Sequence, residues 1–241
     1  MLSIIIPAHQ EEKRIGKTLE EYGQLFKDAE IIISLNACTD RTLDIVKYYQ
    51  LKYPNIKYIE SEIGAKGAAI IAGFKVAQGD YIGFVDADCS TSAVEYARLM
   101  SNLEDNDGII ASRYMEDSKV EPKQSRGRIV ISRIFNTFVK VMLGLHYSDT
   151  QCGAKIFRKE AIQKILPDLK TGKWGFDIDL LYQLQKQNIF KVREFATVWK
   201  DAEYSTLNVS KAGPNMLLAV VRLRLLYSPF KFIVSIYDKL K

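Results

Sequence analysis

The first half of the chain alternates short apolar runs with longer segments whose apolar residues recur at helical spacing. The apolar runs predict strands, at residues 2–7, 30–35, 56–59, 80–85 and 108–111. The intervening segments predict helices, at residues 11–26, 39–53, 66–78 and 91–103. Strands that are apolar on both faces and separated by helices are typical of a mostly parallel sheet covered on both sides. The predicted fold class is therefore α/β.

The second half of the chain departs from this alternation. Apolar residues at helical spacing predict helices at residues 128–145 and 176–186, and short apolar runs predict strands at 154–157 and 192–199. The polar stretch 116–125 predicts a mobile loop. In sheets of this kind ligands bind at the carboxyl ends of the parallel strands, so the residues that follow the early strands are the first candidates for a site.

Two amphipathic helices are predicted at the end of the chain, at residues 214–227 and 229–241. Such helices lie on a membrane surface with their basic residues near the headgroups. Alternatively, they pack on their own domain or on a second subunit, because core-facing helices have the same pattern. We divide the chain into a globular domain, residues 1–211, and membrane-surface helices, residues 212–241.

The sequence favours a peripheral location on the cytoplasmic face of a membrane. No stretch of about 20 uncharged apolar residues is present, so no membrane-spanning helix is predicted. The first residues lack a basic region, and Pro7 interrupts their apolar run, so they predict a first strand rather than a signal peptide.

Charge is distributed unevenly along the chain. Residues 1–112 contain 11 Lys and Arg against 17 Asp and Glu, a net charge of −6, whereas the remainder contains 23 against 12, a net charge of +11. The front half would hold metal and the back half would attract an anion, with nucleic acid, lipid headgroups and a phosphorylated acceptor as candidates. A solvated basic surface is the alternative. Three scattered cysteines and two histidines argue against a disulfide framework, a structural zinc site and a His-rich metal site.

The most informative motif is Asp86-Ala87-Asp88, which follows the apolar run 81–85. Two carboxylates two residues apart on a turn can face one hard cation together. Oxygen ligands suit Mg²⁺ or Mn²⁺, particularly when phosphates complete the coordination shell. The motif therefore predicts a metal-assisted reaction on a phosphorylated substrate.

Polar segments also follow the first two strands. After the first, Glu11 could accept hydrogen bonds from a ribose or base, or could simply complement a helix dipole. After the second, Asn36 could read a base edge, and Thr39 or Asp40 could equally cap a helix. Before the third helix, Lys66 could meet a diphosphate at the helix N-terminus.

Arginines and aspartates mark the second half. Arginine suits bidentate phosphate binding, and four arginines surround the predicted mobile loop, at Arg113, Arg126, Arg128 and Arg133. Residues 149–155 and 174–180 are the other polar-rich segments. Asp177 and Asp179 would point about 200° apart on a helix, so they are not expected to share a ligand.

Taken in this order, the segments resemble family 2 inverting glycosyltransferases of the GT-A fold, a Rossmann-like sheet flanked by helices. The most similar subgroup is the dolichyl-phosphate β-glucosyltransferase and dolichol-phosphate mannose synthase type. The resemblance extends from Ile4-Ile5-Ile6-Pro7-Ala8 to Val198-Trp199-Lys200. Asp149-Thr150-Gln151-Cys152-Gly153 with Lys155, and Phe176-Asp177 with Leu180-Leu181, look like signatures of that subgroup.

The resemblance implies a role for each matched residue. The nucleotide-sugar donor would be bound by Pro7, Ala8, Glu11, Asn36, Asp40, Lys66, Gly67, Asp86, Ala87 and Gln151. Mg²⁺ or Mn²⁺ would be held by Asp86, Asp88 and Ser90. The phosphate of a polyprenyl (dolichyl) phosphate acceptor would meet Arg113 and one or more of Arg126, Arg128 and Arg133. Asp149 would border the sugar, and Trp174 and Asp177 would shape the acceptor end.

The implied reaction moves glucose or mannose from UDP-glucose or GDP-mannose to the lipid phosphate, with Asp86, Asp88, Asp177 and Arg113 as catalytic residues. If the acceptor were instead a glycolipid or glycan hydroxyl, a carboxylate would have to take its proton, and Asp177 or Asp179 would be the candidate. Nucleic acid is not an expected partner under this resemblance.

One departure concerns the base pocket. The family usually has two aspartates after the second strand, where this chain has Leu35 and Asn36. Because an amide can both donate and accept, the base preference can differ, and the choice between uridine and guanosine stays open. The same departure keeps a nucleotide-sugar-binding protein without turnover as a rival. A nucleotidyltransferase is a further rival, but it should have a glycine-rich loop after the first strand, where this chain has Pro7-Ala8-His9-Gln10.

Overall fold

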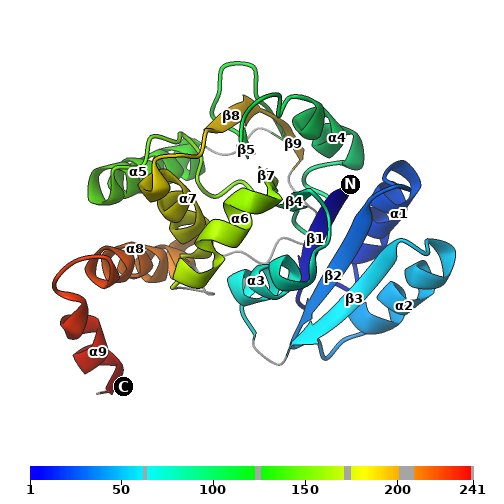
Figure 1. Cartoon of the computed structure of the whole chain (residues 1–241), viewed down its shortest axis with the longest axis horizontal. Coiled ribbons are helices and arrows are strands. Elements are labelled where there is room, and N and C mark those ends of the chain that lie inside the picture. The colour runs from blue at the N-terminus through cyan, green and yellow to red at the C-terminus, as the bar shows by residue number, and fades with distance from the viewer. Residues whose placement is uncertain (62–63, 123–125, 171–174, 201–208, 240–241) are drawn as a thin grey trace.

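The computed structural model describes residues 1–61, 64–122, 126–170, 175–200 and 209–239 (Figure 1). Within them, seven strands form one sheet in the order β3-β2-β1-β4-β7-β5-β8. The strands are β1 (Leu2–Ala8), β2 (Glu30–Asn36), β3 (Ile56–Ser61), β4 (Tyr81–Phe84), β5 (Gly108–Ser112), β7 (Lys155–Arg158) and β8 (Val192–Ala196). Strand β7 runs antiparallel to both of its neighbours, and the other pairings are parallel. The predicted mostly parallel α/β sheet is confirmed.

Helices cover both faces of this sheet (Figure 1). They are α1 (Ile15–Leu25), α2 (Thr42–Lys52), α3 (Lys66–Val76), α4 (Ala93–Ser101), α5 (Arg126–Leu143), α6 (Lys159–Ile165), α7 (Phe176–Gln187), α8 (Val209–Leu226) and α9 (Lys231–Lys239), with a 3₁₀ turn at Leu166–Asp168. Alternate residues of β1 show how the layers are built, because successive side chains of a strand point to opposite faces. Ile4 and Ile6 belong to the core under α1 and α4, whereas Ile5 belongs to the core under α3 and α7.

The strand register brings three loops to one edge of the sheet. Strand β1 lies between β2 and β4 and is parallel to both, with Ala8 opposite Leu35 and Ile5 opposite Phe84. The carboxyl ends of these three strands therefore lie next to one another, as the sequence predicted. Because they are neighbours, the polar segments that follow them can form one site.

The second half shows two differences from the predicted elements. The polar stretch 116–125 contains a short strand, β6 (Lys119–Glu121), which pairs with β9 (Val198–Lys200) in a separate small sheet. The single strand predicted at 192–199 is divided between β8 and β9 at Thr197, whose hydroxyl donates to Glu95 on α4. Such short pairings depend on a distant partner and leave little periodicity in the local sequence.

Helices α5, α8 and α9 gather at one end of the molecule, far from α2 and β3 (Figure 1). Helix α8 packs against α5, and α9 packs against α8. Val220 and Leu223 of α8 are buried in the core, so the inner face of this helix packs on its own domain. Helix α8 begins at Val209, before the predicted boundary at residues 211 and 212, and that division stays a prediction.

Candidate active site

Three loops at the carboxyl edge of the sheet hold residues in the left-handed region of backbone space. Gln10 follows β1 with φ 56°, Ala37 follows β2 with φ 48°, and Cys89 follows β4 with φ 59°. None is glycine, so each conformation is disfavoured by contacts of its own Cβ. Backbone strain of this kind gathers at functional sites and needs surrounding structure to hold it. Its presence in three adjacent loops marks this edge as the candidate site.

Asn36 connects the loops of the donor side. The Nδ1 of His9 lies 2.5 Å from the main-chain carbonyl oxygen of Asn36, and because a carbonyl only accepts, this nitrogen must donate. The side-chain oxygen of Asn36 accepts a hydrogen bond from the main-chain N–H of Ala65 at 2.9 Å. Asn36 is buried and uses its amide oxygen within the protein. Its predicted base contact would therefore use the amide nitrogen.

Hydrogen bonds also join the loop after β1 to the start of α2. The side-chain oxygen of Gln10 accepts from the N–H groups of Thr39 and Asp40 at 3.0 and 3.1 Å. The N–H of Glu11 donates to the hydroxyl of Thr42 at 2.8 Å. Asp40 accepts from the N–H and the hydroxyl of Thr42, at 3.1 and 2.6 Å, and so holds the turn before α2. The N-cap position of α2 is Arg41, and the predicted donor contact of Asp40 stays a prediction.

Four smaller residues of the predicted donor pocket are buried: Pro7, Ala8, Gly67 and Ala87. The carbonyl oxygen of Ala87 accepts a hydrogen bond from the hydroxyl of Thr18 on α1 at 2.7 Å. Because these four residues are small and buried, they line the base of the site, and their side chains do not project into it.

Asp86 and Asp88 follow β4, and their carboxylates lie near different cationic side chains. Asp86 is paired with Lys66, the first residue of α3. Asp88 accepts from both the N–H and the hydroxyl of Ser90, at 3.0 and 2.5 Å, and lies 3.7 Å from the guanidinium of Arg14. Ser90 thus orients Asp88, and the role of Ser90 as a metal ligand stays a prediction. Two partly exposed carboxylates that each attract a cation suit a hard divalent ion.

This environment shifts the pKa values of Asp86 and Asp88 in opposite directions. Burial acts to raise the pKa of Asp86, but the charge and hydrogen bond of Lys66, together with the charges of Lys155 and Arg113, lower it below its ordinary value. Burial and the charge of Asp86 together raise the pKa of Asp88. Among the described residues, no group of three or more His, Cys, Asp or Glu side chains could hold a metal ion. The protein therefore offers Asp86 and Asp88, and phosphate oxygens of a substrate would have to complete the shell of Mg²⁺ or Mn²⁺.

Glu11 lies beside this acidic pair and is held by Arg14. Its carboxylate accepts two hydrogen bonds from the guanidinium, at 2.8 and 2.7 Å. Burial raises the pKa of Glu11, and the charges of Asp88 and Asp86 add to the effect, while Arg14 opposes it. The charges of Asp86 and Asp88 thus act on Glu11, and its predicted contact with a ribose or base stays a prediction.

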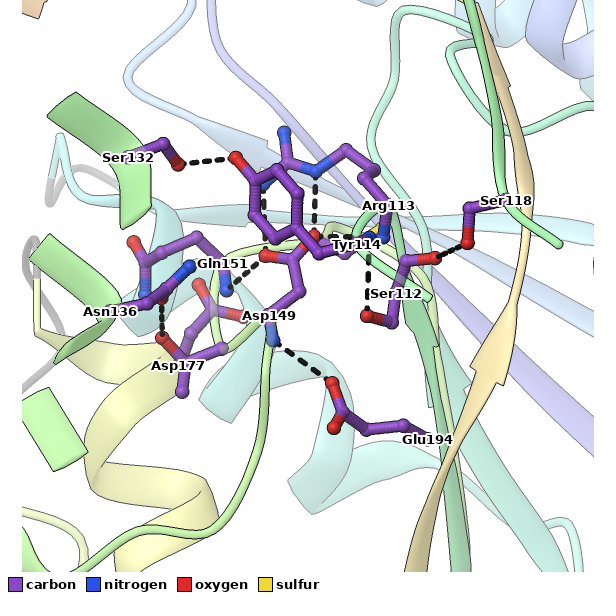
Figure 2. A network of polar contacts seen from close by, with 12 residues as sticks. Ser112, Arg113, Tyr114, Ser118, Ser132, Asn136, Asp149, Gln151, Asp177 and Glu194 are labelled. Atoms are coloured by element: carbon purple, nitrogen blue, oxygen red, sulfur yellow. Dashed lines mark hydrogen bonds and ion pairs between the residues drawn. The ribbon is translucent and has the colours of Figure 1, made fainter. Parts of the chain in front are cut away.

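Arg113 and Asp149 form a buried bidentate ion pair (Figure 2). The Nε and Nη2 of Arg113 donate to the two carboxylate oxygens of Asp149 at 2.7 and 3.0 Å. Burial acts to raise the pKa of Asp149, but Arg113 outweighs it and lowers the pKa. Glu194 of β8 holds the main chain here by accepting from the N–H groups of Ser148 and Asp149, at 2.7 and 2.9 Å. A phosphate could meet Arg113 only through the part of its guanidinium that faces away from Asp149.

The remaining predicted phosphate-binding arginines lie on α5. The guanidinium of Arg133 stacks over the ring of Tyr114, 4.6 Å from its centroid, and is exposed. The hydroxyl of Tyr114 is hydrogen-bonded to Ser132 on the same helix (Figure 2). Arg126 and Arg128 belong to the first turn of α5, and their side chains lie outside those described.

Lys155 and Asp177 form a second ion pair behind the acidic motif. Lys155 is completely buried in β7, and its ammonium donates to Asp177 at 2.6 Å and to the carbonyl oxygen of Cys152 at 2.5 Å. Asp177 is placed at the start of α7 by its neighbour Phe176, whose ring packs edge-on to Phe84 of β4 with centroids 6.0 Å apart. Asp177, a predicted catalytic residue, is therefore the counter-charge of a buried lysine.

Asp179 is not available as a proton acceptor. Its side chain is fully buried and accepts from the hydroxyl of Tyr227 at 2.6 Å and from the N–H of Lys170 at 2.7 Å. Asp177 and Asp179 contact different partners, and the expectation that they do not share a ligand stays a prediction. The carboxylate of Asp179 fastens Tyr227, just after α8, to α7, and this contact disfavours its alternative role as a base.

Gln151 and Trp174 were both predicted near the substrate. The side-chain nitrogen of Gln151 is buried, with no hydrogen-bond partner among the described residues. A buried donor of this kind is available to a ligand oxygen, which suits the predicted donor contact. Trp174 lies outside the described residues.

Comparison with known proteins agrees with this architecture. The Glycosyl transferase family 2 model matches residues 3–166. The chain belongs to glycosyltransferase family 2. This glycosyltransferase is 31% identical to a dolichyl-phosphate β-glucosyltransferase of Dictyostelium discoideum, over 94% of the chain and 74% of the relative. It is 29% identical to the protein of the same name from Saccharomyces cerevisiae, over 94% and 75%.

Solved structures confirm the fold of the glycosyltransferase. Glucosyl-3-phosphoglycerate synthase of Mycobacterium tuberculosis, crystallised with Mn²⁺, UDP and phosphoglyceric acid, superposes with a TM-score of 0.70 at 15% identity, over 93% of this chain and 77% of that one. The TarS fragment of S. aureus with UDP-GlcNAc gives 0.60 at 17% identity, over 95% and 67%. The predictions of a GT-A fold and of a dolichyl-phosphate-type glycosyltransferase are confirmed.

Residue patterns did not single out several groups that shape the site of this glycosyltransferase. Arg14 and Glu194 act through contacts with segments distant in the sequence. Gly153 lies within a segment that resembles the subgroup, but its contact with Asp86 did not follow from the sequence. For Lys155 a signal was present, since a lysine within a short apolar strand must find an interior partner.

Proposed function

We propose that this enzyme transfers a hexose, with inversion, from a nucleoside-diphosphate sugar to a polyprenyl (dolichyl) phosphate at a membrane surface. The choice of acceptor rests on one observation. Asp177 and Asp179, the two predicted proton acceptors, are already bonded to other groups of the protein. A phosphate acceptor is already an anionic nucleophile and needs no base, whereas a hydroxyl acceptor does. The same site can therefore serve the first acceptor more readily than the second.

Breaking the ion pair between Asp177 and Lys155 would also cost free energy. Protonating Asp177 would leave the ammonium of Lys155 buried without its counter-charge, and an unpaired buried charge costs several kcal/mol. Asp179 is fully buried against Tyr227 and the main chain of Lys170. Neither carboxylate can take a proton from an acceptor without first losing a contact that the fold uses.

The relatives support the same acceptor and donor classes. The relatives from Dictyostelium and yeast are named for glucosyl transfer to dolichyl phosphate. The mycobacterial structural neighbour holds Mn²⁺ and UDP. We infer UDP-glucose as the preferred donor, with GDP-mannose as the alternative that the altered base pocket at Asn36 keeps open.

Residues of the donor side would stabilise the departing diphosphate. Asp86 and Asp88 would hold Mg²⁺ or Mn²⁺, which neutralises charge on the leaving group. Lys66 stands at the first position of α3, so its ammonium and the N-terminus of that helix both favour an anion. Gln151 would donate its free amide hydrogen to a sugar oxygen. The acceptor phosphate would attack the anomeric carbon from the side opposite to the diphosphate, guided by the arginines of α5.

A membrane surface would meet the end of the molecule formed by α5, α8 and α9. No helix among the described residues is long and apolar enough to cross a membrane. Large apolar side chains nevertheless face outward on each of these helices: Val130, Ile131, Ile134 and Val141 on α5, Leu217, Leu218 and Val221 on α8, and Phe232, Ile233, Ile236 and Tyr237 on α9, with Phe230 just before it. Apolar faces edged by lysine and arginine are typical of helices that lie in the headgroup region. The cytoplasmic face of the membrane stays a prediction.

A donor and acceptor panel tests the proposal. Purified protein with Mn²⁺ or Mg²⁺ is incubated with labelled UDP-glucose or GDP-mannose, and with either dolichyl phosphate or a glycolipid that ends in a hydroxyl. We expect labelled dolichyl-phosphate hexose and no labelled glycolipid. Transfer to the glycolipid alone would overturn the proposed acceptor, and tight nucleotide binding without any product would favour the non-catalytic rival.

The Asp88→Ala variant tests whether the reaction uses the acidic pair as a metal site. If the acidic pair holds the metal, this variant should lose at least about 10²-fold in turnover, since it removes one of two protein ligands. An unchanged rate in Asp88→Ala would remove the metal site from the mechanism.

A further inference from the structure

Two lysine–aspartate pairs lie close together at the centre of the site. Lys66 is paired with Asp86, and Lys155 is paired with Asp177. Gly153 lies directly against the carboxylate of Asp86, and the carbonyl oxygen of its neighbour Cys152 accepts from Lys155, so one short turn links the two pairs. Burial acts to lower the pKa of Lys66, but the charges of Asp86 and Asp177 outweigh it and raise the pKa. The charge of Asp177 therefore acts on Lys66, whereas its carboxylate is bonded to Lys155.

We propose that Lys155 is a positioning residue that holds Asp177 away from Lys66, so that Lys66 remains free to serve Asp86 and the donor diphosphate. The role of the diphosphate rests on the proposed function. Lys155 itself touches no substrate in this arrangement, because its ammonium is enclosed by the protein.

The place of Lys155 is determined by the strand register. In the antiparallel pairing of β4 and β7, Lys155 lies opposite Phe84, two residues before Asp86. Its ammonium stacks over the ring of Phe84, 5.1 Å from the centroid. Phe84 also packs against Phe176, which precedes Asp177. One aromatic ring thus fixes both members of the Lys155–Asp177 pair relative to the metal-binding motif.

Replacing Lys155 by an uncharged residue would leave the carboxylate of Asp177 without a counter-charge. A buried carboxylate that loses its partner is strongly destabilised, and the protein relieves this by finding a new counter-charge. Lys66 is the suitable replacement because its side chain is partly exposed and flexible and already interacts with the charge of Asp177. A Lys66–Asp177 pair would withdraw Lys66 from Asp86 and from the diphosphate.

Nucleotide binding by two variants tests this inference: Lys155→Met and the double variant Lys155→Met with Asp177→Asn. Titration calorimetry with Mn²⁺ and UDP or GDP measures the affinity. We expect Lys155→Met to bind about tenfold more weakly, the loss typical of one charged contact. The double variant should bind within about threefold of the parent, since it contains neither the unpaired lysine nor the carboxylate that captures Lys66. A double variant as weak as Lys155→Met, or a Lys155→Met variant that binds normally, would overturn the proposal.

A stability cycle without ligand gives a second and independent readout. Lys66→Met should lower the melting temperature more in the Lys155→Met background than in the parent, because Lys66 there neutralises Asp177. Equal effects in both backgrounds would refute the re-pairing. If the parent bound no nucleotide, the donor part of the proposed function would fail, while this cycle would still decide the pairing.

Poor folding of Lys155→Met would also be informative. The double variant should then fold, because removing both members of a buried ion pair costs less than removing one. A double variant that is as unstable as Lys155→Met would show that the lysine acts by some route other than Asp177.

Discussion

Gly153 lies directly against the carboxylate of Asp86. A Cβ on Gly153 would overlap this carboxylate, so a larger residue in the turn after Gln151 and Cys152 would displace Asp86 of the acidic motif. The turn is anchored on one side by Lys155, which binds the carbonyl of Cys152, and on the other by Asp149. The position of Asp86 is therefore set by a contact from a segment far along the chain.

We expect Gly153→Ala to weaken Mn²⁺-dependent nucleotide binding by an order of magnitude or more, because the new methyl group must displace Asp86. The fold should survive, since the site lies at an edge of the sheet. Calorimetry with Mn²⁺ and UDP measures the effect. Gly127→Ala is the matched control, because no atom of the described residues lies within 4 Å of a Cβ at that position. Equal affinities in the two variants would contradict the packing argument.

Much of the donor side could be predicted from the sequence, because it depends on local pattern. Apolar runs identified the parallel strands, and the ends of parallel strands meet at one edge. Asp86 and Asp88 followed directly from that reasoning. The roles of Asn36 and Asp40 were harder to infer, since an amide or carboxylate in a loop can bind a ligand or hold a neighbouring loop, and only the contacts distinguish the two.

The acceptor side could be predicted less well, for a topological reason. Strand β7 was expected, but its antiparallel insertion between β4 and β5 depends on the path of residues 113–154, which no local period records. That insertion brings Lys155 to Asp177 and Gly153 to Asp86. Arg113 was expected to face a phosphate, and the structure instead directs two of its nitrogens to Asp149.

Acid should destabilise the protein partly through Asp149. Its pKa in the folded protein lies below the ordinary value of 3.8, so its contribution to stability is complete above that value and is lost as pH falls through the folded pKa. Asp149→Asn should lower the free energy of unfolding at pH 7 by about 3–5 kcal/mol, because Arg113 loses a buried partner. It should also flatten the dependence of stability on pH below about 4, where Asp149 takes up its proton. Urea unfolding across that range measures both effects, and an unchanged slope would contradict them.

Tyr227 should couple the C-terminal helices to the catalytic domain. Its hydroxyl donates to Asp179 on α7 and lies 3.0 Å from the carbonyl oxygen of Asp168. Tyr227→Phe should cost about 1–3 kcal/mol, since a buried carboxylate loses a hydrogen bond while the ring remains. Thermal unfolding measures the change. Tyr237→Phe on the exposed face of α9 is the control and should leave stability unaltered.

The outer face of α5 provides the sharpest test of membrane contact, because its apolar residues point away from the core. Ile134 and Val141 are 64% and 79% exposed, whereas Val139 between them is fully buried. Ile134→Asn with Val141→Asn should weaken binding to vesicles containing anionic lipid by about tenfold, since each buried apolar side chain contributes about 1.5–3 kcal/mol when transferred completely and less when partly inserted. The melting temperature should hardly move, because neither residue packs in the core.

Vesicle co-sedimentation measures this change at constant ionic strength. Tyr48→Asn with Leu51→Asn on α2 is the matched control, because these side chains are equally exposed but lie at the opposite end of the molecule (Figure 1). The control should bind vesicles as the parent does. Equal losses in the two double variants would indicate non-specific adsorption, and no loss in either would show that α5 does not touch the lipid. A loss confined to α5 would place the arginines of that helix at the surface where a lipid phosphate is found.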